Sequence, residues 1–193
     1  MDSAVKGRRD FAELLADRRG LIEAPHYAGE VEQITAAIVT AFRDGKKVLW
    51  MGNGGSAADA QHLAAEFTGR FLRERRALPS EALSVNPSAV TAIGNDYGYD
   101  NVFARQIEAF VTPGDVVVGI TTSGKSENVL RGLQEAKRRG AVTVAFSGNG
   151  GGPCAQAADL VLTGPSGYSA IIQEVHITMG HIICDLVEQH LML

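Results

Sequence analysis

The chain has 193 residues, 45% of them apolar and 21% charged, which are the proportions of a soluble globular protein made of one domain. Its formal net charge of −4 argues against a nucleic-acid binder, because such proteins carry a basic excess. Two cysteines without C-x-x-C spacing argue against a disulfide framework or a structural zinc cluster.

The first part of the chain, residues 1–45, is predicted to be a helical extension. Residues 11–15 hold three apolar side chains at helical spacing, and residues 27–44 form a longer apolar stripe that Gly45 ends. We find no apolar signal core here and no stretch of about 18 apolar residues anywhere, so we expect a cytoplasmic protein that does not enter a membrane.

Short apolar runs then alternate with amphipathic stretches. The predicted strands are 47–51, 81–85, 116–120, 142–146 and 159–163. The predicted helices between them are 56–72, 100–111 and 126–139, with the arginine-rich stretch 70–76 interpreted as a solvated helix end. Strands that are apolar on both faces and separated by helices indicate a mainly parallel sheet. We therefore predict a three-layer α/β/α sandwich with five strands.

The last segment, residues 169–190, repeats the apolar helical stripe of the first part of the chain. One five-stranded sheet cannot cover all of these stripes. We therefore expect some of them to meet other copies of the chain in a homo-oligomer; packing within one chain is the alternative.

The first glycine-rich loop reads GNGGSA and follows the strand at 47–51. Gly52, Gly54 and Gly55 allow a sharp turn and a close approach to a ligand, and Ser56 is expected at the N-cap of the next helix. A helix N-terminus of this kind favours a bound anion. The alternatives are a plain turn with a cap, and a dinucleotide site, for which strand 81–85 lacks the acidic residue at its end.

The second loop, GITTSGKSENV at 119–129, matches the Walker A pattern from Gly119 to Ser126. No other predicted strand ends in the acidic residue that a P-loop nucleotidase needs for magnesium, which argues against that interpretation. The same segment instead offers four hydroxyls around a helix start, a pattern suited to one phosphate monoester. They belong to Thr121, Thr122, Ser123 and Ser126.

Two pairs of residues could perform acid–base chemistry or bind a metal. His62 and Glu66 are spaced i, i+4 on one helical face, and Gln173 and His181 lie eight residues apart on the last helix, about 80° apart around its axis. Imidazole and carboxylate groups suit zinc binding or proton transfer. The alternative is an ordinary surface contact between helical neighbours.

Four blocks of this sequence resemble the phosphoheptose isomerase family, a branch of the sugar-isomerase (SIS) domain proteins. They are GNGGSAADAQHLAAEFTGRF, AIGNDYGYDNVFARQ, TTSGKSENV and IQEVHITMGH, and they span about 47–190 in the family's order. The resemblance implies a single SIS domain over 1–193, assembled as a homotetramer whose N-terminal helices form a central bundle. It also implies conversion of sedoheptulose 7-phosphate into D-glycero-D-manno-heptose 7-phosphate.

The resemblance further implies a role for individual residues. Glu66 and His181 would be the catalytic acid–base pair, and zinc would bind at His62, Glu66, Gln173 and His181. The residues expected to bind the substrate, its phosphate or its sugar, are Asn53, Gly54, Gly55, Ser56, Arg70, Asn95, Asp96, Thr121, Thr122, Ser123, Ser126 and Gln173.

One segment departs from the family pattern. Many members read Asp-Thr-x-Arg/Lys before Ile-Gln-Glu, whereas this chain reads Tyr-Ser-Ala-Ile at 168–171, with Ser169 replacing the threonine hydroxyl. An alternative function is a non-catalytic SIS protein that binds a phosphosugar or a replication-initiation partner. Such relatives lack the glutamate and the late histidine that this chain carries as Glu66 and His181, which favours the enzyme.

Overall fold

The computed structural model of the chain describes residues 10–165 and 167–192, so the first nine residues of the predicted extension lie outside it. Its strands are all parallel, in the order β2-β1-β3-β4-β5. They are β1 (Val48–Gly52), β2 (Ser80–Ala82), β3 (Val116–Thr121), β4 (Val142–Ser147) and β5 (Leu160–Thr163). The helices are α1 (Phe11–Ile22), α2 (Tyr27–Arg43), α3 (Gly55–Thr68), α4 (Pro87–Tyr97), α5 (Val102–Phe110), α6 (Glu127–Arg138), α7 (Gly152–Ala157) and α8 (Ser169–Leu191), with a 3-10 turn at Tyr99–Asn101.

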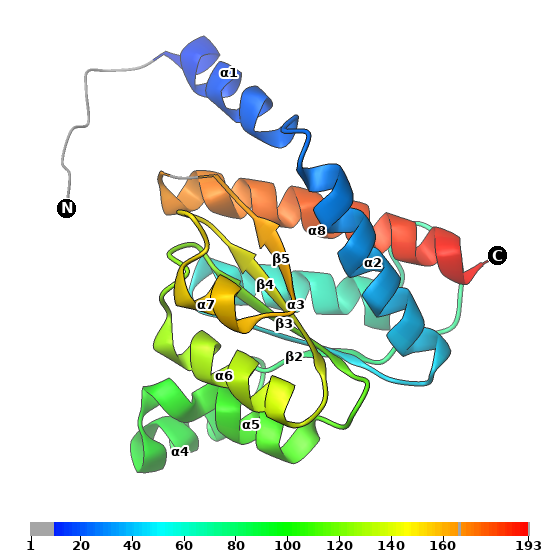
Figure 1. The fold of residues 1–193 in the computed structure, drawn as a ribbon, viewed down its shortest axis with the longest axis vertical. Coiled ribbons are helices and arrows are strands. Elements are labelled where there is room, and N and C mark those ends of the chain that lie inside the picture. The colour runs from blue at the N-terminus through cyan, green and yellow to red at the C-terminus, as the bar shows by residue number, and fades with distance from the viewer. Residues whose placement is uncertain (1–9, 166, 193) are drawn as a thin grey trace.

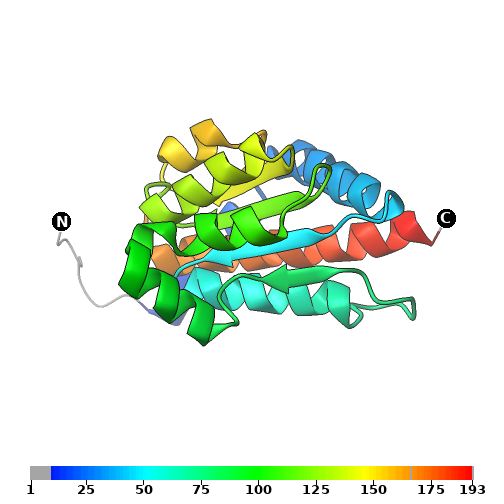
Figure 2. The same ribbon diagram turned by 90° about the horizontal axis from the view of Figure 1, so that it is seen from below.

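The sheet lies between two helical layers (Figures 1 and 2). Alternate strand residues such as Trp50, Val118 and Phe146 pack into one core with α2, α3 and α8. Their neighbours Leu49 and Val117 pack into a second core with α5 and α6. Because successive strand side chains point to opposite faces, strands buried on both sides need helices on both sides. The predicted three-layer α/β/α sandwich is confirmed.

The second strand and the helix after it differ from the prediction. β2 has only three residues and ends at Ala82, whereas the predicted strand extended to residue 85. The Asn86 side chain accepts a hydrogen bond from the Ala89 N–H, and Pro87 occupies the first turn of α4, a helix that the prediction missed. An asparagine N-cap followed by proline at the first helical position is a start signal that the sequence already contained.

The arginine-rich stretch 70–76 is not a solvated helix end, and that interpretation was wrong. α3 ends at Thr68, and the chain continues without regular secondary structure to β2. The side chain of Arg75 is only 6% exposed, because it forms an ion pair with Glu188 of α8. The stretch is therefore a largely exposed connection with one buried arginine, whose partner on α8 helical spacing did not reveal.

Helices α1 and α8 occupy opposite extremes of exposure. α1 extends away from the body (Figure 1), with Phe11 79% exposed, and is joined to α8 by the ion pair between Arg18 Nε and Glu174 Oε2 at 2.7 Å. α8 is long and apolar enough, by length and composition alone, to cross a membrane. It packs instead on α2 and α3, as the core helix of a soluble protein does.

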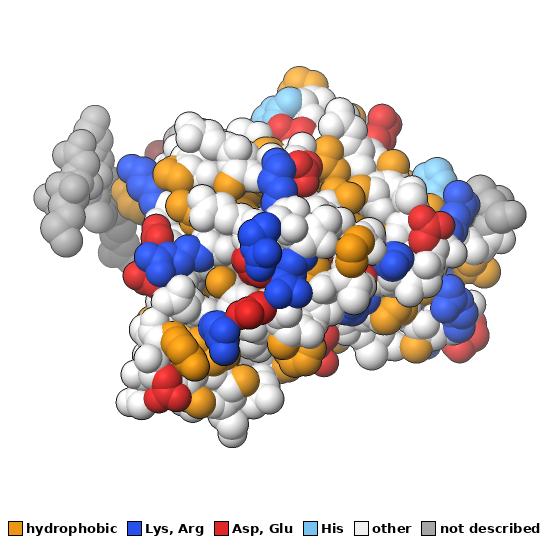
Figure 3. Space-filling view, turned by 60° about the horizontal axis from the view of Figure 1, so that its bottom comes forward, with side chains coloured by type: hydrophobic (Ala, Val, Ile, Leu, Met, Phe, Trp, Pro, Cys, Tyr) orange, Lys and Arg blue, Asp and Glu red, His pale blue; other side chains and the backbone are white. Residues whose placement is uncertain are grey.

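The charged side chains are mixed in sign. On the face drawn in Figure 3, basic groups lie beside acidic ones. Pairs such as Arg131–Glu127 and Arg138–Glu135 line the outer side of α6. This helix ends at Arg138, with basic residues in its last turn and Gly140 at φ +79° beyond it.

Candidate functional site

The first glycine-rich loop joins β1 to α3 and turns at Gly54. Gly54 has φ +55°, a conformation that favours glycine, and it takes the N-cap position of α3. Ser56 therefore does not cap the helix as predicted; it lies in the first turn with a buried side chain. The N-terminus of α3 still faces the loop, so its dipole favours an anion there.

The second loop joins β3 to α6 and gathers hydroxyl groups. The Thr121 and Ser126 hydroxyl oxygens lie 3.0 Å apart, and Ser123 Oγ lies 3.5 Å from Thr121 Oγ1. Thr122 points elsewhere, donating a hydrogen bond of 3.1 Å to Ser169 Oγ at the start of α8. Ser169, which stands in the altered 168–171 segment, therefore contacts this loop directly.

The two loops follow adjacent strands of the sheet. From β1 the chain continues to β2 on one side of the sheet and later returns to β3 on the other side. The carboxyl ends of β1 and β3 therefore mark the point where the strand order reverses. Asn53 and Asn128 exchange two side-chain hydrogen bonds of 2.9 Å across the loops. Ligands of open α/β sheets bind outside the carboxyl ends of the strands at such a point.

The Walker A match has no structural counterpart. Gly119, its first glycine, lies inside β3 rather than in the loop. A Cβ at this position would come within 2.8 Å of Val129 and 3.3 Å of Leu133 of α6, so the glycine is needed for packing. The Walker A pattern therefore combines Gly119, a core residue of the sheet, with the hydroxyl-rich loop that follows β3.

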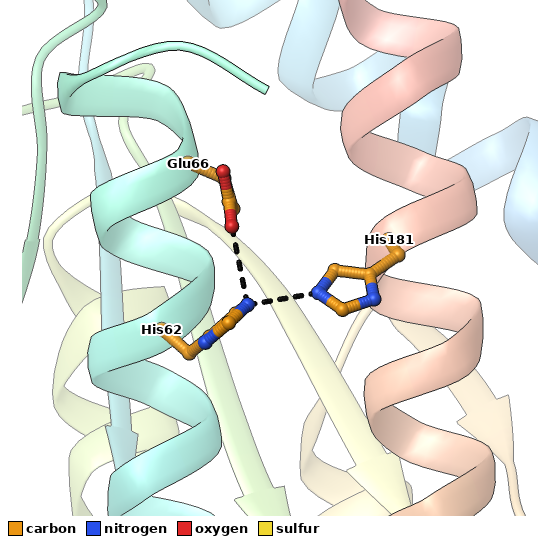
Figure 4. A group of neighbouring side chains, drawn as sticks. All are labelled: His62, Glu66 and His181. Atoms are coloured by element: carbon orange, nitrogen blue, oxygen red, sulfur yellow. Dashed lines mark hydrogen bonds and ion pairs between the residues drawn. The ribbon is translucent and has the colours of Figure 1, made fainter. Parts of the chain in front are cut away.

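A second group of polar residues lies between α3 and α8 (Figure 4). His62 Nε2 lies 3.1 Å from Glu66 Oε1 and 2.9 Å from His181 Nε2. The structure thus brings together the predicted catalytic pair and His62. Because a shared hydrogen bond joins the two imidazoles, one ring nitrogen donates and the other accepts.

Close packing of the two helices places His181 beside His62. Gly180 lies against Leu63, and a Cβ at this position would come within 2.6 Å of the leucine side chain. The Phe71 ring stacks on the His181 ring, with centroids 5.4 Å apart. The sequence pattern did not indicate either contact, although a glycine within the apolar stripe of the last helix was a signal of close approach.

Burial and neighbouring charges set the ionisation of this cluster. Burial lowers the pKa of His181, the nearby His62 lowers it further, and Glu66 opposes both effects. One turn earlier on α3, burial raises the pKa of Asp59, an effect that His62 partly offsets. The sequence interpretation did not single out Asp59, whose Oδ2 is buried without a hydrogen-bond partner among the described residues.

The cluster has the composition of a metal site. One ligand atom from each of His62, Glu66 and His181 lies within 4.8 Å of the other two. Two imidazole nitrogens and one carboxylate oxygen form a donor set that binds catalytic zinc, in which three protein ligands leave one position open. The residues present therefore fit zinc.

The remaining predicted residues lie outside this cluster in the described chain. Gln173 packs against Gly55, where an added Cβ would collide with its amide, and eight residues of helix, about 12 Å, separate it from His181. Arg70 is exposed, with its Nε 3.6 Å from Glu74 Oε2. Asn95 donates to Asp96 Oδ1 at 2.8 Å, at the exposed end of α4.

His176 serves the core of the fold. It is fully buried on α8 with its ring beside Phe146, at a centroid distance of 5.8 Å. Burial lowers its pKa to about 4, so the ring is neutral at neutral pH. The neighbouring histidines of one helix thus have different environments.

Comparison with known proteins places these features in a family. The model of the SIS domain matches residues 19–148. The phosphoheptose isomerase of Aquifex aeolicus is 55% identical over 84% of this chain and 85% of its own length, and that of Pelobacter propionicus is 53% identical over 94% and 97%. Solved structures of phosphoheptose isomerases superpose closely. The enzyme of Neisseria gonorrhoeae has a TM-score of 0.82 and 38% identity, covering 93% of this chain and 95% of its own. The enzyme of Francisella tularensis has a TM-score of 0.85 and 33% identity, covering 94% of this chain and 100% of its own.

Proposed function

The chain belongs to the SIS-domain family, and from that premise we propose that it is a phosphoheptose isomerase. It converts D-sedoheptulose 7-phosphate into D-glycero-D-manno-heptose 7-phosphate, the first step toward nucleotide-activated heptose. The observation that carries this proposal is the contact of Glu66 and His181 with His62 between α3 and α8. The non-catalytic alternative is not favoured, because a binding protein has no need of an acid–base pair.

The reaction moves one proton between neighbouring carbons. Glu66 removes a proton from C1 of the ketose while His181 protonates the carbonyl oxygen at C2, giving a cis-enediol. The same groups then act in reverse, delivering a proton to C2 and taking one from the C1 hydroxyl. The lowered pKa of His181 keeps its imidazole neutral at neutral pH, so that its N–H donates as a weak acid and is readily restored.

The two glycine-rich loops hold the phosphate end of the substrate. The hydroxyls of Thr121, Ser123 and Ser126 and the start of α3 at Ser56 supply neutral donors and a positive helix end. Asn53 and Thr122 stand beside them, and Gly54 and Gly55 leave room for the ligand. Arg70, Asn95, Asp96 and Gln173 are assigned to the sugar.

Zinc is proposed as the cofactor of this site. His62, Glu66 and His181 would hold it, whereas Gln173, the fourth residue implied by the family resemblance, lies outside their cluster in one chain. When bound, zinc supplies Lewis acidity that polarises a carbonyl oxygen.

The active protein is proposed to be a cytoplasmic homotetramer. Glu66 lies eleven residues, about 16 Å of helix, from Gly55 in the first glycine-rich loop. One sugar phosphate would have to extend along three turns of α3, so this separation favours a site in which another copy contributes. The exposed apolar side chains of α1, among them Phe11 and Leu14, offer a surface for that assembly.

Incubation of the purified protein with sedoheptulose 7-phosphate tests this proposal. We expect the aldose to accumulate to an equilibrium ratio, and we expect added zinc to increase the rate in metal-depleted protein. Binding of the sugar phosphate without any conversion, in the presence and absence of zinc, would support the non-catalytic alternative instead.

A further inference from the structure

A buried ion pair lies at the end of α8 beyond the catalytic cluster. Arg75 Nε is 2.9 Å from Glu188 Oε1, and the two side chains are 6% and 0% exposed. Glu188 follows His181 by seven residues, about 10 Å along α8. A buried ion pair contributes little to stability by itself, so the groups that this pair holds in place matter more.

Glu188 holds the loop that carries Phe71. Its two carboxylate oxygens accept hydrogen bonds from three consecutive backbone N–H groups, those of Phe71 and Leu72 at 2.9 Å and of Arg73 at 2.8 Å. Burial alone raises the pKa of Glu188, but these bonds and Arg75 outweigh it, and the pKa is lowered. The carboxylate is therefore ionised and fully engaged.

Arg75 holds the end of α3. Its guanidinium donates to the carbonyl of Glu66 at 2.7 Å, of Phe67 at 2.9 Å and of Gly69 at 3.2 Å. The last carbonyls of a helix have no partner within the helix, and a cation there is favourable. The helix turn that carries the Glu66 carboxylate is thus fixed through its own backbone.

These contacts lead to both members of the acid–base pair. Glu188 fixes the backbone N–H of Phe71, whose ring stacks on His181 with an interplanar angle of 24°. Arg75 fixes the backbone of Glu66. We propose that Arg75 and Glu188 are positioning residues, which set the separation of Glu66 and His181 through the α3 carbonyls and through Phe71. The kinetic part of this inference rests on the proposed function.

Two variants test separately the contact of Arg75 with the α3 carbonyls and the contact of Phe71 with His181. Arg75→Lys keeps the charge beside Glu188 but loses the planar group that reaches three carbonyls, and Phe71→Leu removes the ring that stacks on His181. Asp185→Asn is the matched control: it removes the ion pair of Asp185 with Arg73, which joins the same loop to the same helix through half-exposed side chains.

Two measurements distinguish positioning from simple loop attachment, after thermal melting has shown which variants fold. In Arg75→Lys and Phe71→Leu we expect kcat to fall at least about tenfold while KM stays within about twofold. The chain has five histidines, so ring-labelled histidine gives a simple NMR spectrum. We expect the His181 ring signal to move in Arg75→Lys and to stay in place in Asp185→Asn, whereas Phe71→Leu is judged by kcat alone, because loss of the stacked ring moves that signal by itself.

The inference is overturned if folded Arg75→Lys keeps the wild-type kcat and His181 signal and folded Phe71→Leu keeps the wild-type kcat. It is equally overturned if Asp185→Asn loses as much activity as they do, because loose attachment of the loop would then be sufficient. If the wild-type protein does not isomerise the sugar phosphate, the proposed function fails, whereas the NMR comparison still decides whether this ion pair positions His181.

Discussion

The two parts of the proposed site are built in different ways. The hydroxyls of the phosphate loop come from residues no more than five apart in the chain, Thr121 to Ser126, gathered by one turn. His62 and His181 are 119 residues apart and meet only because α3 and α8 pack closely. In the proposed site, phosphate binding therefore depends on the local backbone of one loop, whereas proton transfer depends on the packing of two helices.

The largest expected effect comes from a change in the proton-transfer part of the proposed site. Glu66→Gln keeps the shape of the side chain but removes the base, and general acid–base groups contribute about 10² to 10⁴ in rate. We expect kcat to fall by about 10³ with KM and folding unchanged, as measured by steady-state kinetics and circular dichroism. Glu108→Gln, which removes an exposed ion pair with Arg105, is the control. A wild-type rate for Glu66→Gln would remove Glu66 from the mechanism.

A pH experiment tests the fully buried histidine of α8, His176. The pKa of His176 is about 4 in the folded protein and about 6.5 when unfolded, so between these values the unfolded chain binds more protons and stability falls as pH falls. This loss is about 2 kcal/mol between pH 7 and pH 5. His176→Leu should remove it in urea unfolding at fixed protein concentration. An unchanged pH dependence would show that the pKa of His176 is the same in the folded and the unfolded protein.

Helix packing is tested at Gly180. An alanine Cβ would press on Leu63, and overpacking costs about 1–3 kcal/mol, partly offset by the better helix propensity of alanine. We expect Gly180→Ala to be less stable by about 1–2 kcal/mol and to bind zinc more weakly. In Gly94→Ala the added Cβ meets nothing nearer than 3.9 Å, so this control should not lose stability. Equal stability of the two variants would contradict the close-packing account.

The smallest expected effect on kcat concerns the hydroxyl-rich loop after β3. Ser126→Ala removes one hydroxyl donor, and one hydrogen bond to a charged group is worth about 1.5–3 kcal/mol. We expect KM to rise about tenfold with kcat nearly unchanged. Lys125→Gln should change KM less than this, since the Lys125 side chain is exposed and the proposed phosphate site consists of hydroxyls. A larger rise in KM for Lys125→Gln than for Ser126→Ala would instead support a site of the P-loop type.

The sequence predicted the local features of this molecule well. The five parallel strands, the two glycine-rich loops and the placement of His62 and Glu66 on one helix follow from periodicity and turn residues, which act within a few residues. Helix α4 was missed although its Asn86–Pro87 start was visible in the sequence.

The sequence could not predict contacts that packing creates. Nothing near Arg75 indicates a partner 113 residues away, and the stretch 70–76 was therefore interpreted as a solvated helix end. The pairing of Phe71 with His181 and the close approach at Gly180 also depend on how α8 lies on α3. The placement of Gln173 beside Gly55 depends on the same packing.

The most direct test of the account is an NMR time course of the purified protein with sedoheptulose 7-phosphate in D₂O. We predict conversion to the heptose 7-phosphate with deuterium entering at C2, because an enediol formed by Glu66 and His181 takes its new proton from a site that exchanges with solvent. Absence of both product and deuterium incorporation, with zinc present, would contradict the proposed isomerase.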